Sequence, residues 1–168
     1  MERIKAAQPA IILETDKTFA SILEIQRGAF VVDAKADNSP VTAADEEAEA
    51  LILARLAEAA PDVPVVAEEM MARGAAPDPG SRFFLVDPLD GTTNFLHGIP
   101  HWNITIALEQ KGEVIAGIIY DAVKDEMFRA EKGTGAFMRN KRLRVSGRTV
   151  MEQSVVLTGE PRRVPETQ

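Results

Sequence analysis

The sequence predicts an α+β fold in which two N-terminal helices pack on a mostly antiparallel β-sheet. Apolar residues recur with a helical period before Pro61, and short apolar runs with strand composition follow from Val63 onward. The later runs are joined by links too short for parallel crossovers, which need about a dozen residues or more. Antiparallel pairing is therefore favoured for most of the sheet.

Two segments carry the helical pattern. The first extends from about Ala10 to Arg27, with Gly28 as its stop signal. The second is clearer, because its apolar residues follow a period of about 3.6 and Pro61 ends the segment. The residues on this predicted face are Ala44, Ala48, Leu51, Ile52, Arg55, Leu56 and Ala59. The stretch from Val31 to Pro40 is predicted to be a polar connector.

The strand-type runs begin with Val63–Ala67 and Phe83–Val86, and a loop rich in Gly, Ala and Pro joins them. A meander is predicted beyond residue 102, with turn pairs such as Lys111-Gly112 between its strands. Its predicted strands are Asn103–Leu108, Val114–Tyr120, Glu126–Ala130 and Gly135–Val145, and another is expected at Ser154–Thr158. We expect one α+β domain over residues 1–160 and a polar tail over 161–168.

Charge and composition restrict the classes of partner. With 19 basic and 26 acidic residues the net charge is -7, which makes nucleic acid an unlikely partner because its phosphates attract clustered Lys and Arg. The one basic cluster, Arg139–Arg144, is predicted to be the solvent face of a hairpin. The absence of cysteine excludes thiolate catalysis and suits the cytoplasm. No apolar run approaches the roughly 20 residues of a membrane span, so no membrane partner is expected.

The segment Asp87-Pro88-Leu89-Asp90-Gly91-Thr92-Thr93 carries the chemistry. Pro88 restricts Asp87 to extended backbone, and Gly91 permits a conformation that larger residues resist. Two carboxylates three residues apart are thereby held at a sharp turn after an apolar strand. Such hard oxygen ligands suit Mg²⁺. A tight Asx turn without any ligand is the alternative for this motif alone.

Two further acidic elements favour the metal site. Glu68 and Glu69 follow the strand Val63–Ala67, and alternation along a strand allows only one of them to face a shared site. Thr42 and Asp45 form a capping pattern that opens the second helix. Each element also has an ordinary structural explanation, a solvated strand end or a helix cap. The capping role of Asp45 is compatible with a role as a base, or as the group that orients one.

Together, Asp87–Phe95, Glu68-Glu69 and Val41–Asp45 resemble the inositol monophosphatase superfamily of Mg²⁺-dependent, lithium-sensitive phosphatases, and the resemblance extends from roughly Val32 to Thr158. It implies hydrolysis of a small phosphorylated substrate, such as an inositol monophosphate, by metal-activated water. The implied metal ligands are Glu68, Asp87, the carbonyl of Leu89 and Asp90. The implied catalytic residues are Asp45 and Thr92, and the implied phosphate contacts are Gly91 and Thr92. Thr93 is a further candidate substrate contact, because its hydroxyl and amide suit a phosphate. His97 and His101 are predicted to pack within the loop after the motif.

The resemblance is mixed. The segments Lys35–Asp45 and Arg82–Asp87 resemble the 3′(2′),5′-bisphosphate nucleotidase branch, whereas Asp90–Pro100 resembles the inositol monophosphatase branch. Phosphate removal from 3′-phosphoadenosine 5′-phosphate is therefore an alternative reaction. The superfamily also implies a second α/β region with a further ligating Asp after a Trp. Asn103 follows the single tryptophan here, Trp102, so we expect that region and that ligand to be missing.

An incomplete sheet predicts a second kind of function. A sheet without its second layer would expose an edge or an apolar face, and such surfaces favour self-association. The alternative to an enzyme is therefore a non-catalytic or weakly active truncated or hybrid domain of the same fold. In either case a homo-oligomer is expected.

Overall fold

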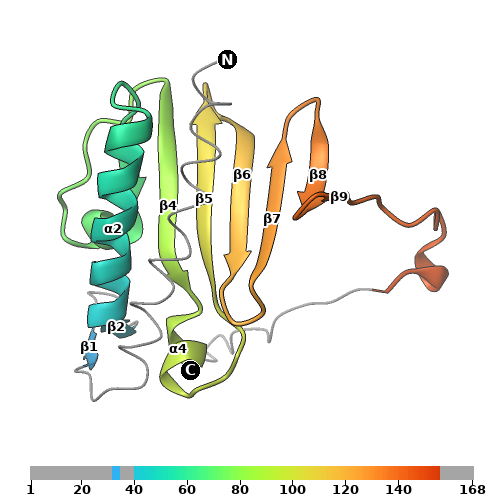
Figure 1. Cartoon of the computed structure of the whole chain (residues 1–168), viewed down its shortest axis with the longest axis horizontal. Helices are drawn as coiled ribbons and strands as arrows, with labels where there is room; N and C mark the ends of the chain where they lie inside the picture. The colour runs from blue at the N-terminus through green and yellow to red at the C-terminus, as the bar shows by residue number, and fades with distance from the viewer. Residues whose placement is uncertain (1–31, 35–39, 156–168) are drawn as a thin grey trace, which may run out of the picture.

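The computed structural model of the chain describes residues 32–34 and 40–155, in which one helix lies on one face of a seven-stranded sheet (Figure 1). The helix is α2 (Ala43–Ala59). This arrangement confirms the predicted α+β class. The first predicted helix, at about residues 10–27, lies outside the described residues, as does the predicted boundary at residue 160. That division of the chain stays a prediction.

The sheet has the strand order β3-β4-β5-β6-β7-β8-β9. Its strands are β3 (Val65–Ala67), β4 (Arg82–Asp90), β5 (Asn103–Gln110), β6 (Glu113–Asp121), β7 (Glu126–Glu131), β8 (Gly135–Met138) and β9 (Lys141–Arg142). Only β3 and β4 pair in parallel within this sheet, as the longer connection between them allows. The strands from β5 onward are joined by turns of two to four residues and pair antiparallel, as predicted.

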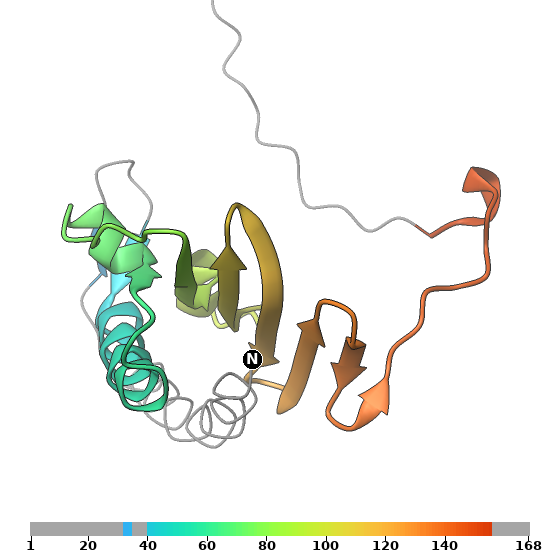
Figure 2. The ribbon, with the colours of Figure 1, turned by 90° about the horizontal axis from the view of Figure 1, so that it is seen from above.

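The hairpin turns have the chemistry that their geometry requires. Lys111 and Gly112 join β5 to β6 with φ values of 55° and 79°, and two positive φ angles give the type of turn that matches strand twist. Seen from above, α2 lies on one side of the sheet, and β8 and β9 lie at the end farthest from it (Figure 2). The basic segment Arg139–Arg144 is exposed at that end, as predicted.

The core lies between α2 and the middle of the sheet. Ala48, Ile52 and Leu56 of α2 belong to one buried cluster with Phe84 and other side chains of β4 and β5. Ala44, Ala48, Ile52 and Leu56 of the predicted face are buried, and the buried side of α2 also includes Asp45 and Glu49, which are only 1% and 2% exposed. Within the described residues, no helix is long and apolar enough to cross a membrane.

Two short strands and one short helix were not predicted. The expected connector over Val31–Pro40 contains parts of two strands, β1 (Val32–Ala34) and β2 (Pro40–Thr42), which pair antiparallel. Glu68 and Glu69 directly follow β3, as predicted, but they also begin a short helix, α3 (Glu68–Ala72). These elements have three to five residues, too few for a periodic pattern to be visible in the sequence.

Two predicted strands also have different bounds. The run Gly135–Val145 is interrupted at Arg139, whose φ of 50° turns the chain between β8 and β9. Near the C-terminus, the 3₁₀ helix η1 (Met151–Gln153) precedes Ser154 and Val155, which have no strand structure. The rest of the predicted strand Ser154–Thr158 lies beyond the described residues.

Candidate metal and phosphate site

Strand β4 carries both aspartates of the motif and continues through Asp90, rather than ending before Asp87 as predicted. Its register with β5 shifts between them, since Asp87 lies opposite Thr105 and Asp90 opposite Asn103. This irregularity places an extra residue in β4, which bends a strand locally. The backbone N–H of Leu89 donates a hydrogen bond to Asp87 Oδ1 at 3.1 Å, so the Asx turn is present as well.

Gly91 makes the turn after β4 possible. Its φ is +100°, and a Cβ at this position would lie 3.0 Å from the carbonyl oxygen of His101. Helix α4 (Thr92–Leu96) begins immediately afterwards. Phe95 and Trp102 hold this helix in place, with their rings edge to face and their centroids 5.4 Å apart.

The predicted catalytic pair is brought together. The Thr92 hydroxyl lies 3.0 Å from Asp45 Oδ1 and 3.2 Å from the carbonyl oxygen of Leu89. Asp45 is almost completely buried at the start of α2. A buried carboxylate needs hydrogen-bond donors, and Thr92 supplies one of them. Asp45 thereby connects α2 to the motif across 47 positions of sequence.

The remaining predicted residues of the loop lie at its surface. Thr93 is exposed, and its carbonyl oxygen lies 2.7 Å from Nδ1 of His97. The carbonyl oxygen of His101 accepts a hydrogen bond from the Asn94 side chain at 2.7 Å. Both histidines are exposed, and the contacts that place them are with the loop itself. The side-chain contact of His97 agrees with the predicted packing within the loop, and for His101 that packing stays a prediction.

Three carboxylates meet around Asp87. Burial, the charge of Glu68, a hydrogen bond with Glu68 and the charge of Asp90 together raise the pKa of Asp87 to about 7, and burial contributes most. The Leu89 N–H acts in the opposite direction. A hydrogen bond between two carboxyl groups requires a shared proton. Below about pH 7 this cluster therefore tends to hold a proton in a place where a cation would relieve the same repulsion.

The donor set fits a hard divalent cation in its chemistry, because it offers only carboxylate and carbonyl oxygens. As they stand, however, no three acidic or histidine side chains among the described residues converge tightly enough to hold a metal. Glu68 shares a hydrogen bond with Asp87, and the exposed Asp90 side chain is bonded to Asn103. Of the two glutamates, only Glu68 is among the groups that raise the pKa of Asp87, and Glu69 is buried at 3% exposure. Alternation along a strand is not the reason, since both residues are helical.

The model of the inositol monophosphatase family matches residues 4–168 of the chain. The chain belongs to the inositol monophosphatase family. This membership confirms the resemblance that the motif residues suggested.

Individual members of the family are similar over most of this chain. An inositol-1-monophosphatase from Mesorhizobium japonicum is 45% identical over 77% of the chain and 48% of the relative. A protein named Nus factor SuhB from Pseudomonas aeruginosa is 40% identical over 73% of the chain and 45% of the relative. The chain thus spans about half the length of the curated relatives it matches.

The fold is shared as well. The solved structure of an IMPase from Thermotoga maritima superposes with a TM-score of 0.74 at 32% sequence identity, over 88% of this chain and 55% of that one. The order of helix α2, the parallel pair β3-β4 and the antiparallel meander is therefore an inositol monophosphatase arrangement. This family membership supports a phosphatase, at the level of the whole family.

The sequence reasoning missed three polar residues around the family's motif. Asn103 Nδ2 donates a hydrogen bond to Asp90 Oδ2 at 3.1 Å, a contact that the pairing of β4 with β5 creates. Glu49 of α2 and Arg73, the residue directly after α3, form an ion pair with an N···O distance of 2.6 Å. A signal for Glu49 existed, because it follows Asp45 by four residues and so shares its side of the helix.

Proposed function

We propose that the chain is the metal- and phosphate-binding part of a Mg²⁺-dependent phosphomonoesterase that acts on a small phosphate ester of the inositol monophosphate kind. The observation that carries the proposal is the contact of Thr92 with buried Asp45, directly beside the carboxylates of Asp87 and Asp90. A hydroxyl oriented by a carboxylate lies next to a cluster suited to a cation. Few structural roles require both features together.

Glu68, Asp87, Asp90 and the carbonyl of Leu89 would hold the cation. When bound, Mg²⁺ would neutralise the phosphate and lower the pKa of the attacking water. Asp87 must give up its proton for this, and its pKa of about 7 makes that loss easy near neutral pH. Asp90 would be kept in position by Asn103.

Asp45 and Thr92 would act on the attacking water. The Thr92 hydroxyl donates to Asp45, so its oxygen keeps lone pairs that can accept a hydrogen bond from water. The water would give a proton to Thr92 while Thr92 gives its own proton to Asp45. Asp45 would thus act as a general base through the Thr92 hydroxyl. The backbone N–H groups of Gly91, Thr92 and Thr93, at the beginning of α4, would contact the phosphate oxygens.

Phosphate release tests this proposal. The chain is incubated with inositol 1-phosphate or with 3′-phosphoadenosine 5′-phosphate, with and without Mg²⁺, and Asp90→Asn is the control. We expect Mg²⁺-dependent release from inositol 1-phosphate, inhibition of it by Li⁺, and loss of it in Asp90→Asn. Release only from the nucleotide would favour the alternative reaction. No release beyond the control would refute catalysis by this chain.

A cytoplasmic location, expected from the cysteine-free sequence, is also part of the proposal.

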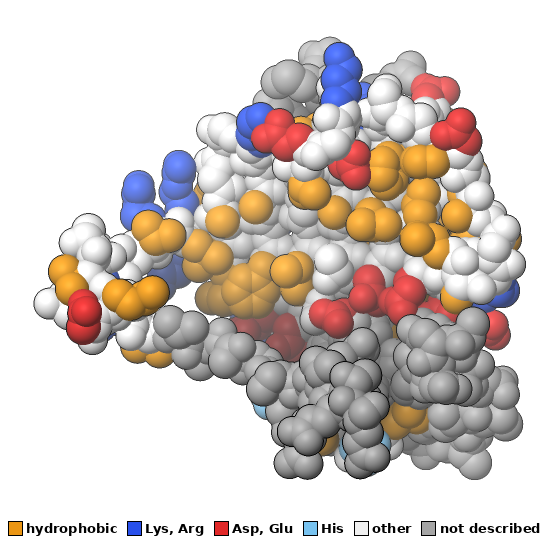
Figure 3. Space-filling view, turned by 180° about the vertical axis from the view of Figure 1, so that it is seen from behind, with side chains coloured by type: hydrophobic (Ala, Val, Ile, Leu, Met, Phe, Trp, Pro, Cys, Tyr) orange, Lys and Arg blue, Asp and Glu red, His pale blue; other side chains and the backbone are white. Residues whose placement is uncertain are grey.

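The second candidate function is self-association without catalysis. On the sheet face opposite α2, hydrophobic side chains are exposed over the strands (Figure 3). Leu85 and Ile119, which alternate along β4 and β6 with buried core residues, are 44% and 46% exposed. In addition, residues of strands β5 to β9 line a hollow of about 830 Å³. Exposed apolar faces of this kind favour association. A binding role is also compatible with the name Nus factor that one relative carries. A monomer in solution would count against this candidate.

A further inference from the structure

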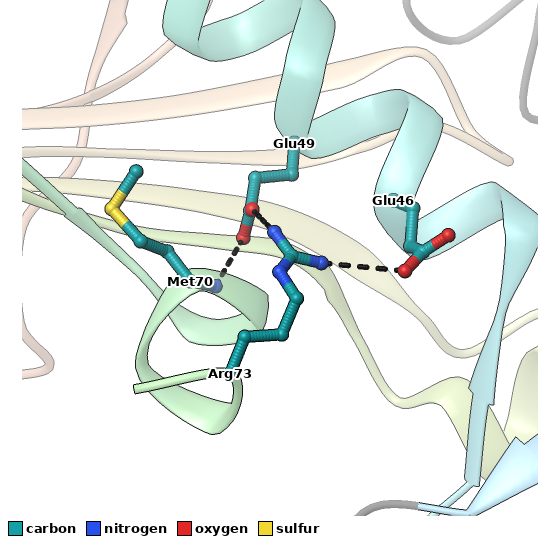
Figure 4. A network of polar contacts seen from close by, with 4 residues as sticks. All are labelled: Glu46, Glu49, Met70 and Arg73. Atoms are coloured by element: carbon teal, nitrogen blue, oxygen red, sulfur yellow. Dashed lines mark hydrogen bonds and ion pairs between the residues drawn. The ribbon is translucent and has the colours of Figure 1, made fainter. Parts of the chain in front are cut away.

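Glu49 is a buried carboxylate that connects α2 to α3 (Figure 4). It is 2% exposed, and its Oε1 lies 2.6 Å from Nη2 of Arg73. Its Oε2 accepts a hydrogen bond from the backbone N–H of Met70 at 3.1 Å. Both carboxylate oxygens of Glu49 are therefore bonded to α3 or to the residue directly after it. Glu46, one turn earlier on α2, adds only an exposed contact with Arg73 at 3.3 Å.

These contacts fix both ends of α3. The residue before the helix, Ala67, makes no side-chain capping bond, so the first-turn N–H groups need an acceptor from elsewhere. Glu49 supplies it at Met70, the third residue of α3. Arg73, which follows the last residue of α3, returns its guanidinium to the same carboxylate. A helix of five residues is not stable alone, so these contacts determine where α3 lies.

The position of α3 matters because Glu68 is its first residue. Asp45 and Glu49 lie one turn apart on the buried side of α2, and Asp45 contacts Thr92 of the motif. One side of α2 thus aligns the motif through Asp45 and α3 through Glu49. Glu68 of α3 is brought beside Asp87 by this arrangement.

We propose that Glu49, paired with Arg73, is a positioning residue that holds Glu68 beside Asp87 for cation binding. The proposal rests on the function proposed above, and it adds a residue that touches neither metal nor substrate. The plainer explanation is an ion pair that only stabilises the fold. Buried ion pairs are weak evidence for stability, because the cost of desolvation offsets much of the attraction. Cation affinity, measured on folded protein, separates the two explanations.

The test is titration of the full chain with Mn²⁺, followed by electron paramagnetic resonance, below the melting temperature of each variant. Glu49→Ala is compared with Glu58→Ala, which removes the same charge from an exposed position of the same helix, where Glu58 pairs with Arg55 at 2.9 Å. We expect Mn²⁺ to bind about tenfold or more weakly to Glu49→Ala, the loss typical of residues that orient metal ligands, and within about twofold of wild type to Glu58→Ala.

Conservative variants keep the test decisive if Glu49→Ala does not fold. Glu49→Gln retains an acceptor for Met70 but loses the ion pair, so its affinity should lie between those of Glu49→Ala and wild type. Affinities of Glu49→Ala, or failing that of Glu49→Gln, equal to that of Glu58→Ala would overturn the positioning role. Asp87→Asn tests the site itself. If Asp87→Asn binds Mn²⁺ as tightly as wild type, the proposed metal site is wrong, and so is the proposed role of Glu49.

Discussion

The hydroxyl of Thr92 and the carboxylate of Asp45 lie 3.0 Å apart, although 47 positions separate them in the sequence. Asp45 is 1% exposed, so this contact lies in the interior, where hydrogen bonds to charged groups are strongest. It connects the first turn of α2 to the first residue of α4. The contact thereby fixes Asp45 of α2, the proposed base, relative to Thr92 of α4, which would bind the attacking water.

Replacement of Asp45 by Asn should reduce turnover more than cation binding. The amide keeps the shape of the side chain but cannot accept a proton, so we expect kcat to fall by about 10²–10⁴-fold. The affinity for Mn²⁺ should stay within about threefold, because Asp45 is not a proposed ligand. Thr92→Ser, which keeps the hydroxyl, serves as the matched control and should retain most activity. Equal losses of kcat and of Mn²⁺ affinity in Asp45→Asn would contradict this division of roles.

The metal-free protein should lose stability as pH rises toward neutrality. Asp87 has a folded pKa of about 7, above its ordinary 3.8, so its folded state favours the protonated form. The stability this contributes is complete below about pH 4 and is lost as pH rises through 7. We expect the difference in melting temperature between wild type and Asp87→Asn to change over this range. A difference that stays constant from pH 4 to 8 would contradict the assignment.

Cation binding should have the opposite pH dependence. Below pH 7 the cation must displace the proton of Asp87, so the apparent Mg²⁺ affinity should fall by up to about tenfold per pH unit. Calorimetry in buffers of different ionisation enthalpy would measure the released proton. Proton release near zero at pH 6, with Mg²⁺ bound, would mean that Asp87 is not the group displaced.

Gly91 should be intolerant of even a methyl group. Gly91→Ala combines a positive φ with a contact of 3.0 Å to the His101 carbonyl, and we expect it to cost about 2–4 kcal/mol of unfolding free energy. Gly112 also has a positive φ, but nothing lies within 4 Å of its Cβ position. Gly112→Ala should therefore cost only about 1–2 kcal/mol, from backbone strain alone. Urea unfolding measures both, and equal costs would show that the close approach at Gly91 is unimportant.

The exposed sheet face should determine the oligomeric state. Ile119→Lys places a charge on the face opposite α2, where Ile119 is 46% exposed. If copies associate through this face, the variant should be monomeric in size-exclusion chromatography with light scattering. Val145→Lys is the control, since Val145 is 97% exposed and lies outside the strands. Association that survives Ile119→Lys would place the interface elsewhere.

The regular part of the fold could be predicted from the sequence because its patterns are long. Helix α2 extends over 17 residues and ends before Pro61, so its period and its stop signal are both visible. The meander could be predicted from turn pairs such as Lys111-Gly112. Strands β1 and β2 and helix α3 were missed, since three to five residues carry no period. The break at Arg139 was missed because Arg is not a typical residue at positive φ.

The site was predictable as a set of residues but not as a geometry. The motif indicated Asp87 and Asp90 directly, whereas the contact of Thr92 with Asp45 could be expected only from resemblance to a family. No spacing rule relates residues so far apart. The spacing of four residues from Asp45 was the one signal for Glu49, and nothing in the sequence indicated its partner Arg73. The structure explains the burial of Glu49, because Met70 of α3 and Arg73 directly after it supply partners for both carboxylate oxygens.

Glu68, Asp87 and Asp90 are proposed to form a divalent cation site. A crystal structure of the full chain soaked in Mn²⁺ tests this site most directly. We expect an anomalous difference peak within about 2–2.5 Å of oxygens from all three side chains. The carbonyl oxygen of Leu89 should lie at a similar distance. No peak at Asp87, or a peak bound by other residues alone, would contradict the account.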